Sequence, residues 1–223
     1  MTDPDLKQQL ADAIRMLEHA GFIDHAGHAS ARRDESSFHI NSGASVRGAL
    51  TVHDIVTTDM DGGLLEGSAR PPLEFHIHSE IYRARPDVGA VIHMHPRWTT
   101  LLTMTGIPYA PVYAQGVLLG DVPVLDSPLS VNTSAMGRRL ANTLGTGRAA
   151  LLKSHGAVVV GADLIECFAL AAYCEENACR QYMAAQIGTP YVFSEAEQQA
   201  CRENLWSPGL FAKVWGHYRS KVG

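Results

Sequence analysis

The strongest local signal for chemistry is a pair of histidines in the segment His93-Met94-His95. Side chains two residues apart on a strand point to the same face, so these two imidazoles can bind one ion together. Pro96 follows at once and ends the strand, which places the pair beside a loop with room for a substrate. Two unrelated strand histidines would give the same pattern, so a metal site needs further donors.

Two other segments supply such donors. His155 lies at a predicted tight bend between two apolar runs, where an unpaired imidazole would be costly, so it must form a hydrogen bond or bind a metal. Glu74 and His78 are four residues apart in a helical pattern and therefore share a face of that helix. Three histidines and one carboxylate form an open metal site, the arrangement that catalytic zinc uses when one position is left for water or substrate.

The elements that must position these residues alternate between helical and extended patterns. Helices are predicted over 3–20, 72–85, 98–104, 130–144 and 163–187, and the glycine-rich segment 21–36 is expected to be mainly loop. Strands are predicted over 37–41, 55–59 and 88–95, and the segments 149–153 and 157–160 are expected to form either a strand pair or one bent strand. Residues 194–223 are expected to form a terminal helix and a tail. This mixture predicts one α/β layered domain over residues 1–223.

Composition narrows the class of protein further. The 223 residues are 46% hydrophobic and carry a net charge of −5, which predicts a folded protein without a basic surface for nucleic acid. The N-terminus lacks the basic start and apolar run of a secretory signal, and no apolar stretch approaches a membrane span. The four cysteines match neither a metal motif nor a disulfide framework. We therefore expect a cytoplasmic protein with reduced thiols and no membrane partner.

Several spaced motifs together resemble the class II aldolase/adducin family. They begin with the segment from Gly27 to Arg32 and continue with Glu74-Phe-His-Ile-His78 and the segment from Ile81 to Val88. The segments from Ala90 to His95 and from Lys153 to Gly156 complete the series. Several motifs in the right order are far more specific than one histidine pair.

The resemblance implies a three-layer α/β/α sandwich of the class II aldolase type. It also implies a homotetramer with active sites between subunits. By position, His93, His95 and His155 would bind one divalent metal ion, with Zn²⁺ or Mn²⁺ favoured and Fe²⁺ or Co²⁺ as alternatives. Glu74 would be the acid/base residue and a ligand of the ion when the site is empty. Tyr113 falls where some family aldolases carry a tyrosine proton donor, and Tyr109 is a rival.

Departures from the sugar-phosphate aldolases of this family bear on the substrate. Those enzymes typically have Gly-Asn in the first glycine motif and Ser-Ser-Glu before the catalytic glutamate, whereas this chain has Gly27-His28 and Pro72-Leu73-Glu74. The loss of two hydroxyl donors favours a substrate without phosphate. Arg32 or Arg70 could bind a carboxylate with two hydrogen bonds. The expected substrate-binding residues are His28, Ser30, Ser42, Gly43 and Arg70.

The leading hypothesis is a metal-dependent carbon–carbon lyase acting on a small carboxylate. The Gly-His variant resembles the branch of the family that decarboxylates hydroxylated aromatic or pyridine dicarboxylates, through an enolate that the metal stabilises. The alternative is a metal-dependent aldolase that cleaves a small hydroxy-keto acid or sugar. An oxygenase built on the same ligands ranks lower. The non-enzymatic alternative is an adducin-like interaction module, which the retained metal histidines disfavour.

Overall fold

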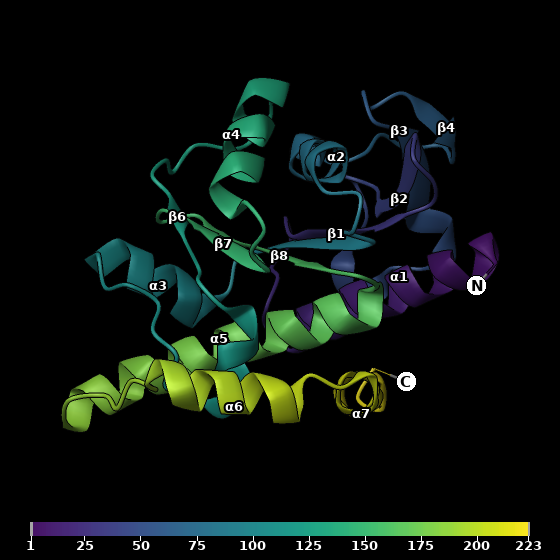
Figure 1. Cartoon of the computed structure of the whole chain (residues 1–223). Coiled ribbons are helices and arrows are strands. Elements are labelled where there is room, and N and C mark those ends of the chain that lie inside the picture. The colour runs from purple at the N-terminus through teal and green to yellow at the C-terminus, as the bar shows by residue number, and fades with distance from the viewer. Residues whose placement is uncertain (1, 223) are drawn as a thin grey trace.

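A computed structural model describes residues 2–222 of the chain and contains one eight-stranded sheet (Figure 1). The strands are β1 (His28–Arg32), β2 (Ser37–Asn41), β3 (Ile55–Asp59), β4 (Leu64–Glu66), β5 (Ala90–Met94), β6 (Val124–Leu125), β7 (Ala149–Leu152) and β8 (Gly156–Gly161). Their order in the sheet is β4-β3-β2-β1-β5-β8-β7-β6. Every neighbouring pair is antiparallel except β6 and β7.

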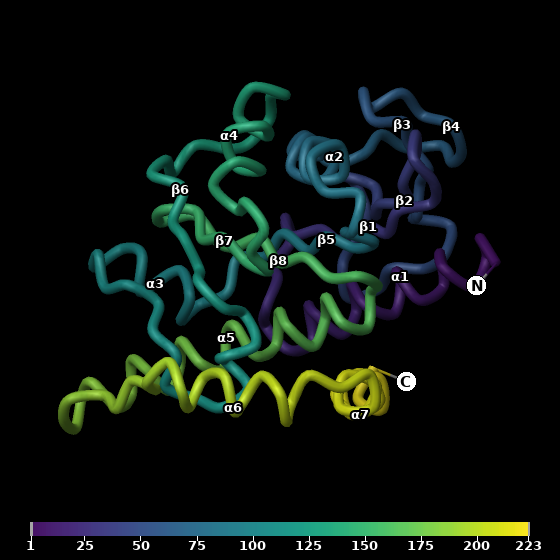
Figure 2. The backbone as a smooth tube through the Cα atoms, in the orientation of Figure 1, coloured from purple at the N-terminus to yellow at the C-terminus, as the bar shows by residue number. Residues whose placement is uncertain are grey.

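Helices cover both faces of this sheet, which confirms the predicted three-layer α/β/α sandwich. They are α1 (Asp3–His19), α2 (Phe75–Ala84), α3 (Arg97–Thr105), α4 (Ser134–Leu144), α5 (Leu164–Ile187), α6 (Glu195–Leu205) and α7 (Pro208–Arg219). Three short 3₁₀ helices, η1 (Arg47–Ala49), η2 (Val52–Asp54) and η3 (Ala114–Leu119), lie in the connections. Figure 2 shows α2 and α4 on one side of the sheet and α1 and α5 on the other, with α6 and α7 beyond α5.

The core consists of two apolar layers because strand side chains alternate between the faces of the sheet. In β5, Ala90, Ile92 and Met94 pack against the α1 and α5 side, and Val91 packs against the α2 and α4 side. His93 is in phase with Val91 and therefore points toward α2. None of the helices in the described part of the chain is long and apolar enough to cross a membrane.

Two expectations about the elements were wrong. The C-terminal segment forms two helices rather than a helix and a tail, because α7 begins at Pro208, a residue that suits the first turn of a helix. The segment expected to be mainly loop contains β1, which lies near the middle of the sheet between β2 and β5. Its small residues Ala29 and Ala31 are almost fully buried there and allow α1 to approach the sheet closely.

A buried carboxylate fixes the start of α3, directly after the histidine pair. Glu175 in α5 accepts hydrogen bonds from the backbone N–H groups of Trp98 (2.8 Å) and Thr99 (2.9 Å) and from the Thr99 hydroxyl (2.7 Å). We expect Glu175→Ala to lower the free energy of unfolding by about 2–4 kcal/mol, because two buried donors and a helix N-terminus lose their partner. Urea unfolding measures this change. Glu176→Ala, at an exposed neighbour paired with Arg180, should cost less than about 0.5 kcal/mol.

Candidate active site

Four side chains from three separate segments converge at the end of β5. His93 lies in β5, His95 follows it, His155 lies in the turn between β7 and β8, and Glu74 immediately precedes α2. Each residue offers one ligand atom, and these four atoms all lie within 4.8 Å of one another. The structure therefore brings together the four residues that the sequence motifs single out as metal ligands. His78 is not among them.

The sheet and one tight turn hold these histidines in place. β5 pairs with β8, with Met94 opposite Ala157, and this pairing places the β7–β8 turn beside His95. A Cβ atom on Gly156 would lie 2.3 Å from the Met94 carbonyl oxygen, so only glycine allows the two strands to come this close. As a result the rings of His95 and His155 have centroids 5.2 Å apart.

The hydrogen bonds of the histidine pair leave two lone pairs facing each other. The Nδ1 atom of His93 lies 3.2 Å from the Ala157 carbonyl oxygen, and that of His95 lies 3.0 Å from Asp24 Oδ1. Both partners are acceptors, so each ring donates through Nδ1 and keeps a lone pair on Nε2. Burial lowers the pKa of His93 to about 3, so its ring is neutral. The two Nε2 atoms are 3.1 Å apart, an arrangement that a cation between them stabilises.

The spacing of the four donors fits one metal ion. Glu74 Oε2 is 3.5 Å from His93 Nε2, and Glu74 Oε1 is 3.9 Å from His155 Nε2. Tetrahedral ligands at about 2.0–2.1 Å from zinc lie roughly 3.3 Å from one another. Small side-chain movements therefore suffice for all four residues to hold a single divalent ion.

Glu74 is held as a carboxylate at the mouth of this group. Its Oε1 atom accepts a hydrogen bond of 2.8 Å from the backbone N–H of Val131. Burial alone would raise the pKa of Glu74, but the imidazole of His28 and the backbone N–H of Val131 hold that pKa below its ordinary value. An ionised carboxylate in this position can bind a cation or accept a proton from a substrate.

Asp24 orients His95 from behind, as carboxylates commonly do for metal-bound histidines. We expect Asp24→Ala to weaken zinc binding by roughly 10–100-fold, because His95 loses the partner that fixes its tautomer and direction. Competition with a chromophoric chelator measures the affinity. Asp24→Asn is the matched control, since its amide oxygen still accepts from His95, and its loss should be smaller. Unchanged affinity in the alanine variant would remove Asp24 from this role.

A pocket of about 430 Å³ opens beside the four donors and shares Glu74 with them. His28 and Arg47 line it on the polar side, and Ala26, Pro71, Pro72 and Leu73 supply apolar surface. The pocket therefore offers a bound molecule hydrogen-bond donors, a positive charge and apolar contacts next to the metal-binding group. This is the combination expected of a small-molecule active site.

Arg47 is the candidate pocket residue that sequence reasoning missed. It is only 4% exposed, and its guanidinium donates to the carbonyl oxygens of Gly27 (2.7 Å), Ser45 (2.5 Å) and Ser42 (3.3 Å). Over residues 2–222, no carboxylate lies within ion-pair distance of it. In sequence, an arginine in a polar loop resembles any surface arginine. Only the fold places this charge in the wall of the pocket.

The two arginines considered in the sequence lie elsewhere. Arg70 is exposed and does not line the pocket, although its carbonyl oxygen accepts from the Gly43 N–H at 3.0 Å. Arg32 donates to three backbone carbonyl oxygens, among them those of Tyr82 and Val88, and so joins β1 to the end of α2. Its contacts are structural.

The remaining predicted substrate-binding residues differ in access to the pocket. His28 and Gly43 line it. Ser42 is buried at its edge, and its carbonyl oxygen accepts from Arg47. Ser30 is fully buried behind His28, with its hydroxyl bonded to other side chains. The structure therefore places His28 in contact with the pocket and Ser30 in the layer behind it.

Within the single chain, Tyr113 does not reach the metal-binding group. It lines a different hollow with Tyr173 and Tyr218, and the Arg180 guanidinium lies 4.0 Å from the centre of its ring. Tyr109 also does not line the pocket beside Glu74. The C-terminal aromatic residues serve packing, since the Trp215 ring lies against the ring of the core residue Phe168.

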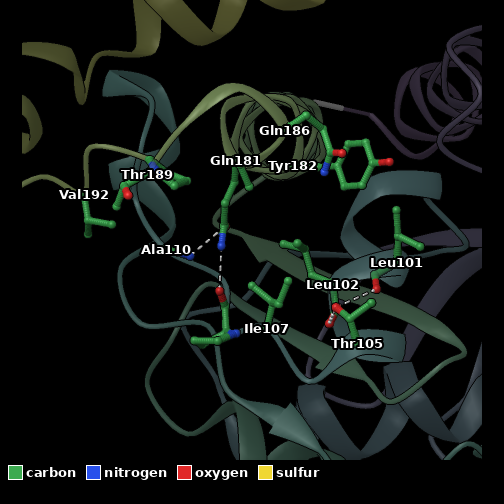
Figure 3. A pocket seen from close by; sticks show the side chains of 13 residues that line it. Leu101, Leu102, Thr105, Ile107, Ala110, Gln181, Tyr182, Gln186, Thr189 and Val192 are labelled. Atoms are coloured by element: carbon green, nitrogen blue, oxygen red, sulfur yellow. Dashed lines mark hydrogen bonds between the residues drawn. The ribbon is translucent and has the colours of Figure 1, made fainter.

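A larger cavity of about 550 Å³ lies between α3, α5 and the segments 107–110 and 189–192 (Figure 3). The amide of Gln181 joins two of these elements by accepting from the Ala110 N–H (2.9 Å) and donating to the Pro108 carbonyl oxygen (2.8 Å). The lining of this cavity contains no acidic, basic or histidine side chain. This cavity has space but no acid, base or metal ligand, so we place the chemistry at Glu74 and the histidines.

The chain is similar to several known proteins in sequence and in fold. Residues 8–183 match the model of the class II aldolase and adducin N-terminal domain. The chain is 32% identical to a 3,4-dihydroxyphthalate decarboxylase of Arthrobacter keyseri, over 70% of this chain and 69% of that protein. It is 28% identical to a 5-methylthioribulose-1-phosphate/5-deoxyribulose-1-phosphate aldolase of Rhodospirillum rubrum, over 94% and 95%. A solved L-fuculose 1-phosphate aldolase superposes with a TM-score of 0.83 at 25% identity, covering 91% of this chain and 97% of that one.

Proposed function

Because the chain belongs to the class II aldolase and adducin family, we propose that it is a metal-dependent carbon–carbon lyase that decarboxylates a hydroxylated aromatic or pyridine dicarboxylate. The observation that carries this proposal is Arg47, a buried guanidinium without an acidic partner among the described residues, in the pocket that Glu74 shares with the metal-binding group. A buried cation of this kind favours an anionic ligand, and a guanidinium matches the two oxygens of a carboxylate. The apolar side of the pocket suits a flat ring.

The four donors would hold a divalent ion, for which we propose Zn²⁺ or Mn²⁺, with Fe²⁺ and Co²⁺ as alternatives. When bound, such an ion acts as a Lewis acid toward the substrate oxygen that gains electrons when the carbon–carbon bond breaks.

The protein's own residues handle the protons. Glu74, ionised and oriented by the Val131 N–H, takes the proton from a substrate hydroxyl. Glu74 then delivers that proton to the ring carbon that bears the leaving carboxylate, which regenerates the Glu74 carboxylate. The leaving group departs as carbon dioxide, and the electrons of the broken carbon–carbon bond pass through the ring to the substrate oxygen, so the reaction balances.

A direct assay tests the reaction. The protein is freed of metal, restored separately with Zn²⁺, Mn²⁺, Fe²⁺ or Co²⁺, and offered 3,4-dihydroxyphthalate and related hydroxylated dicarboxylates while carbon dioxide release is measured. Release that depends on metal supports the proposal. Metal-dependent release of an aldehyde from hydroxy-keto acids or sugar phosphates, without carbon dioxide from the dicarboxylates, would instead establish an aldolase.

The aldolase alternative has a specific observation in its favour. The sugar-phosphate aldolase of Rhodospirillum rubrum aligns over nearly the whole of both chains. Arg47 could also pair with a phosphate group. The two assays above separate these reactions, because only one produces carbon dioxide.

Arg47→Gln tests the proposed carboxylate contact. We expect the KM to rise by roughly 10–100-fold with a smaller change in kcat, because the substrate loses a charged hydrogen-bond partner worth about 1.5–3 kcal/mol. Steady-state kinetics measure both constants, and a melting curve shows whether the carbonyl contacts of Arg47 are needed for folding. Arg70→Gln is the matched control, since its side chain is exposed outside the pocket, and its KM should stay at the wild-type value. An unchanged KM in Arg47→Gln would assign Arg47 to structure alone.

We further propose a cytoplasmic homotetramer with active sites at the subunit interfaces. The exposed apolar side chains of Ile107 and Val192 line the cavity of Figure 3, and the exposed Ile187 follows the lining residue Gln186 in the sequence. Assembly would cover this apolar surface. All four cysteines are free thiols, which agrees with a reducing compartment. Light scattering on the purified protein gives the mass of the assembly, and a monomeric mass would contradict the proposal.

A further inference from the structure

Two rows of polar side chains face each other behind the active site. Glu74, His78 and Tyr82 are spaced four residues apart along α2 and its N-terminus, so they lie on one face of that helix. His28 and Ser30 are two apart in β1 and point to the same face of the sheet. All of these except Glu74 are at most 2% exposed. The rows therefore meet in a region without solvent.

The rows form a continuous chain of short hydrogen bonds. The Tyr82 hydroxyl lies 2.7 Å from Ser30 Oγ, which in turn lies 2.6 Å from His78 Nδ1. His78 Nε2 lies 2.7 Å from His28 Nδ1. The last atom, His28 Nε2, is buried without a hydrogen-bond partner and faces Glu74 Oε2 at 3.8 Å. That distance is too long for a hydrogen bond, so this nitrogen keeps its bonding capacity for another group.

Two histidines, His28 and His78, belong to this hydrogen-bond chain, and each carries one ring proton when it is neutral. His28 and His78 are at most 1% exposed, and no carboxylate within residues 2–222 lies in hydrogen-bond distance of either ring, so both rings are neutral, with one donor and one acceptor nitrogen each. Burial also raises the pKa of Tyr82, which keeps its hydroxyl proton. The hydrogen bond between the two rings then fixes the His28 tautomer: if His78 donates from Nε2, His28 carries its proton on Nε2, and if His28 donates from Nδ1, its Nε2 has a lone pair.

Only one direction satisfies both ends of the chain. If Tyr82 donates to Ser30, Ser30 to His78 and His78 to His28, then the Nε2–H of His28 faces the Glu74 carboxylate. In the opposite direction, an Nε2 lone pair of His28 would face that carboxylate. The Tyr82 hydroxyl would then also lack an acceptor within residues 2–222. An unmatched buried polar group costs about 1–3 kcal/mol, so the first direction is favoured.

We infer that Tyr82, Ser30 and His78 are positioning residues that hold His28 as a fixed Nε2–H donor at the edge of the active site, where it donates to an oxygen of the bound substrate. This role rests on the proposed function, because it assigns a task to His28 in that same pocket. It also gives a separate role, as a hydrogen-bond donor, to His28, which lies close to Glu74 but is not one of the four proposed metal ligands. A donor held in place costs no reorganisation when negative charge develops on the substrate.

The position of the proton on His28 can be read directly. In zinc-loaded protein labelled with ¹⁵N-histidine, long-range ¹H–¹⁵N spectra show for each neutral ring which nitrogen carries the proton, and His28→Gln assigns the signals. We expect the proton of His28 on Nε2. A proton on Nδ1 would overturn the inference. Because this measurement uses no substrate, a failed decarboxylase assay would leave its outcome unaffected.

Removing one hydroxyl from the hydrogen-bond chain tests the role of the positioning residues. Ser30→Ala removes the hydroxyl between Tyr82 and His78, and we expect the His28 nitrogen signals to move toward an average of both tautomers. With zinc content unchanged, kcat should fall by about 10–100-fold. Ser30→Thr, which restores a hydroxyl, should recover both signals and rate.

A second buried pair of the same kind supplies the control. His39 Nδ1 in β2 lies 2.9 Å from the Thr57 hydroxyl in β3, and neither residue belongs to the hydrogen-bond chain that ends at His28. Thr57→Ala therefore removes an equivalent hydrogen bond and should lower stability without altering the His28 signals or kcat. If Ser30→Ala lowers only stability, as this control does, then Ser30 has a purely structural role and the inference fails.

Discussion

Replacing His95 with alanine is expected to weaken zinc binding by roughly 100–1,000-fold while leaving the fold intact. Zinc sites with four protein ligands bind with about 10–16 kcal/mol, so one ligand is worth about 3–4 kcal/mol. His95 follows β5 and its side chain is partly exposed, so its loss removes the proposed metal ligand and the contact with Asp24 but little core volume. Elemental analysis after dialysis, with a circular dichroism spectrum, measures both results.

A neighbouring histidine gives the control for this variant. The side chain of His25 is 92% exposed and lies beside Asp24 without belonging to the metal-binding group. His25→Ala should keep its zinc. Full zinc occupancy in His95→Ala would show that other residues hold the ion.

The second large effect is expected for Glu74→Gln, which should keep metal but lose about 10²–10⁴-fold in kcat. The amide still has an oxygen that can accept from the Val131 N–H, so the segment before α2 should keep its shape. It has no basic oxygen to take a proton from the substrate and return it to carbon. Metal content and the rate of product formation, measured on the same preparation, separate binding from catalysis.

Glu35→Gln makes the same chemical change at an exposed residue between β1 and β2 and should have the wild-type rate. Wild-type turnover in Glu74→Gln would remove Glu74 from the acid/base role. Loss of metal together with activity would instead assign it mainly as a ligand.

The sequence predicted most of the local structure because periodicity is a local property. Alternation over 37–41 and 55–59 corresponds to β2 and β3, and the helical spacing over 163–187 corresponds to α5. The two-residue spacing of His93 and His95 also predicts one shared face, since a strand has no other way to arrange them. By contrast, β1 is short and rich in small residues, so no local pattern distinguished it from loop.

The burial and contacts of the residues around the proposed metal ligands depend on packing between segments that are distant in the sequence, so no local pattern could predict them. Arg47 and Arg70 are both arginines in polar loops, yet the fold buries one in the pocket wall and leaves the other exposed. The sequence motif predicted Ser30 as a substrate-binding residue, but α2 packs over it. The Ser30 hydroxyl is hydrogen-bonded to His78, 48 residues away.

The sequence by itself predicted the α/β class, the family and the four candidate metal ligands, because these follow from spacing and from the order of motifs along the chain. Only the tertiary structure decided which arginine side chain lines the pocket, which hydroxyls are buried away from it and which side chains surround His28. Those properties depend on burial and on hydrogen bonds between β1 and α2, and the chain creates both only when the helix packs on the sheet.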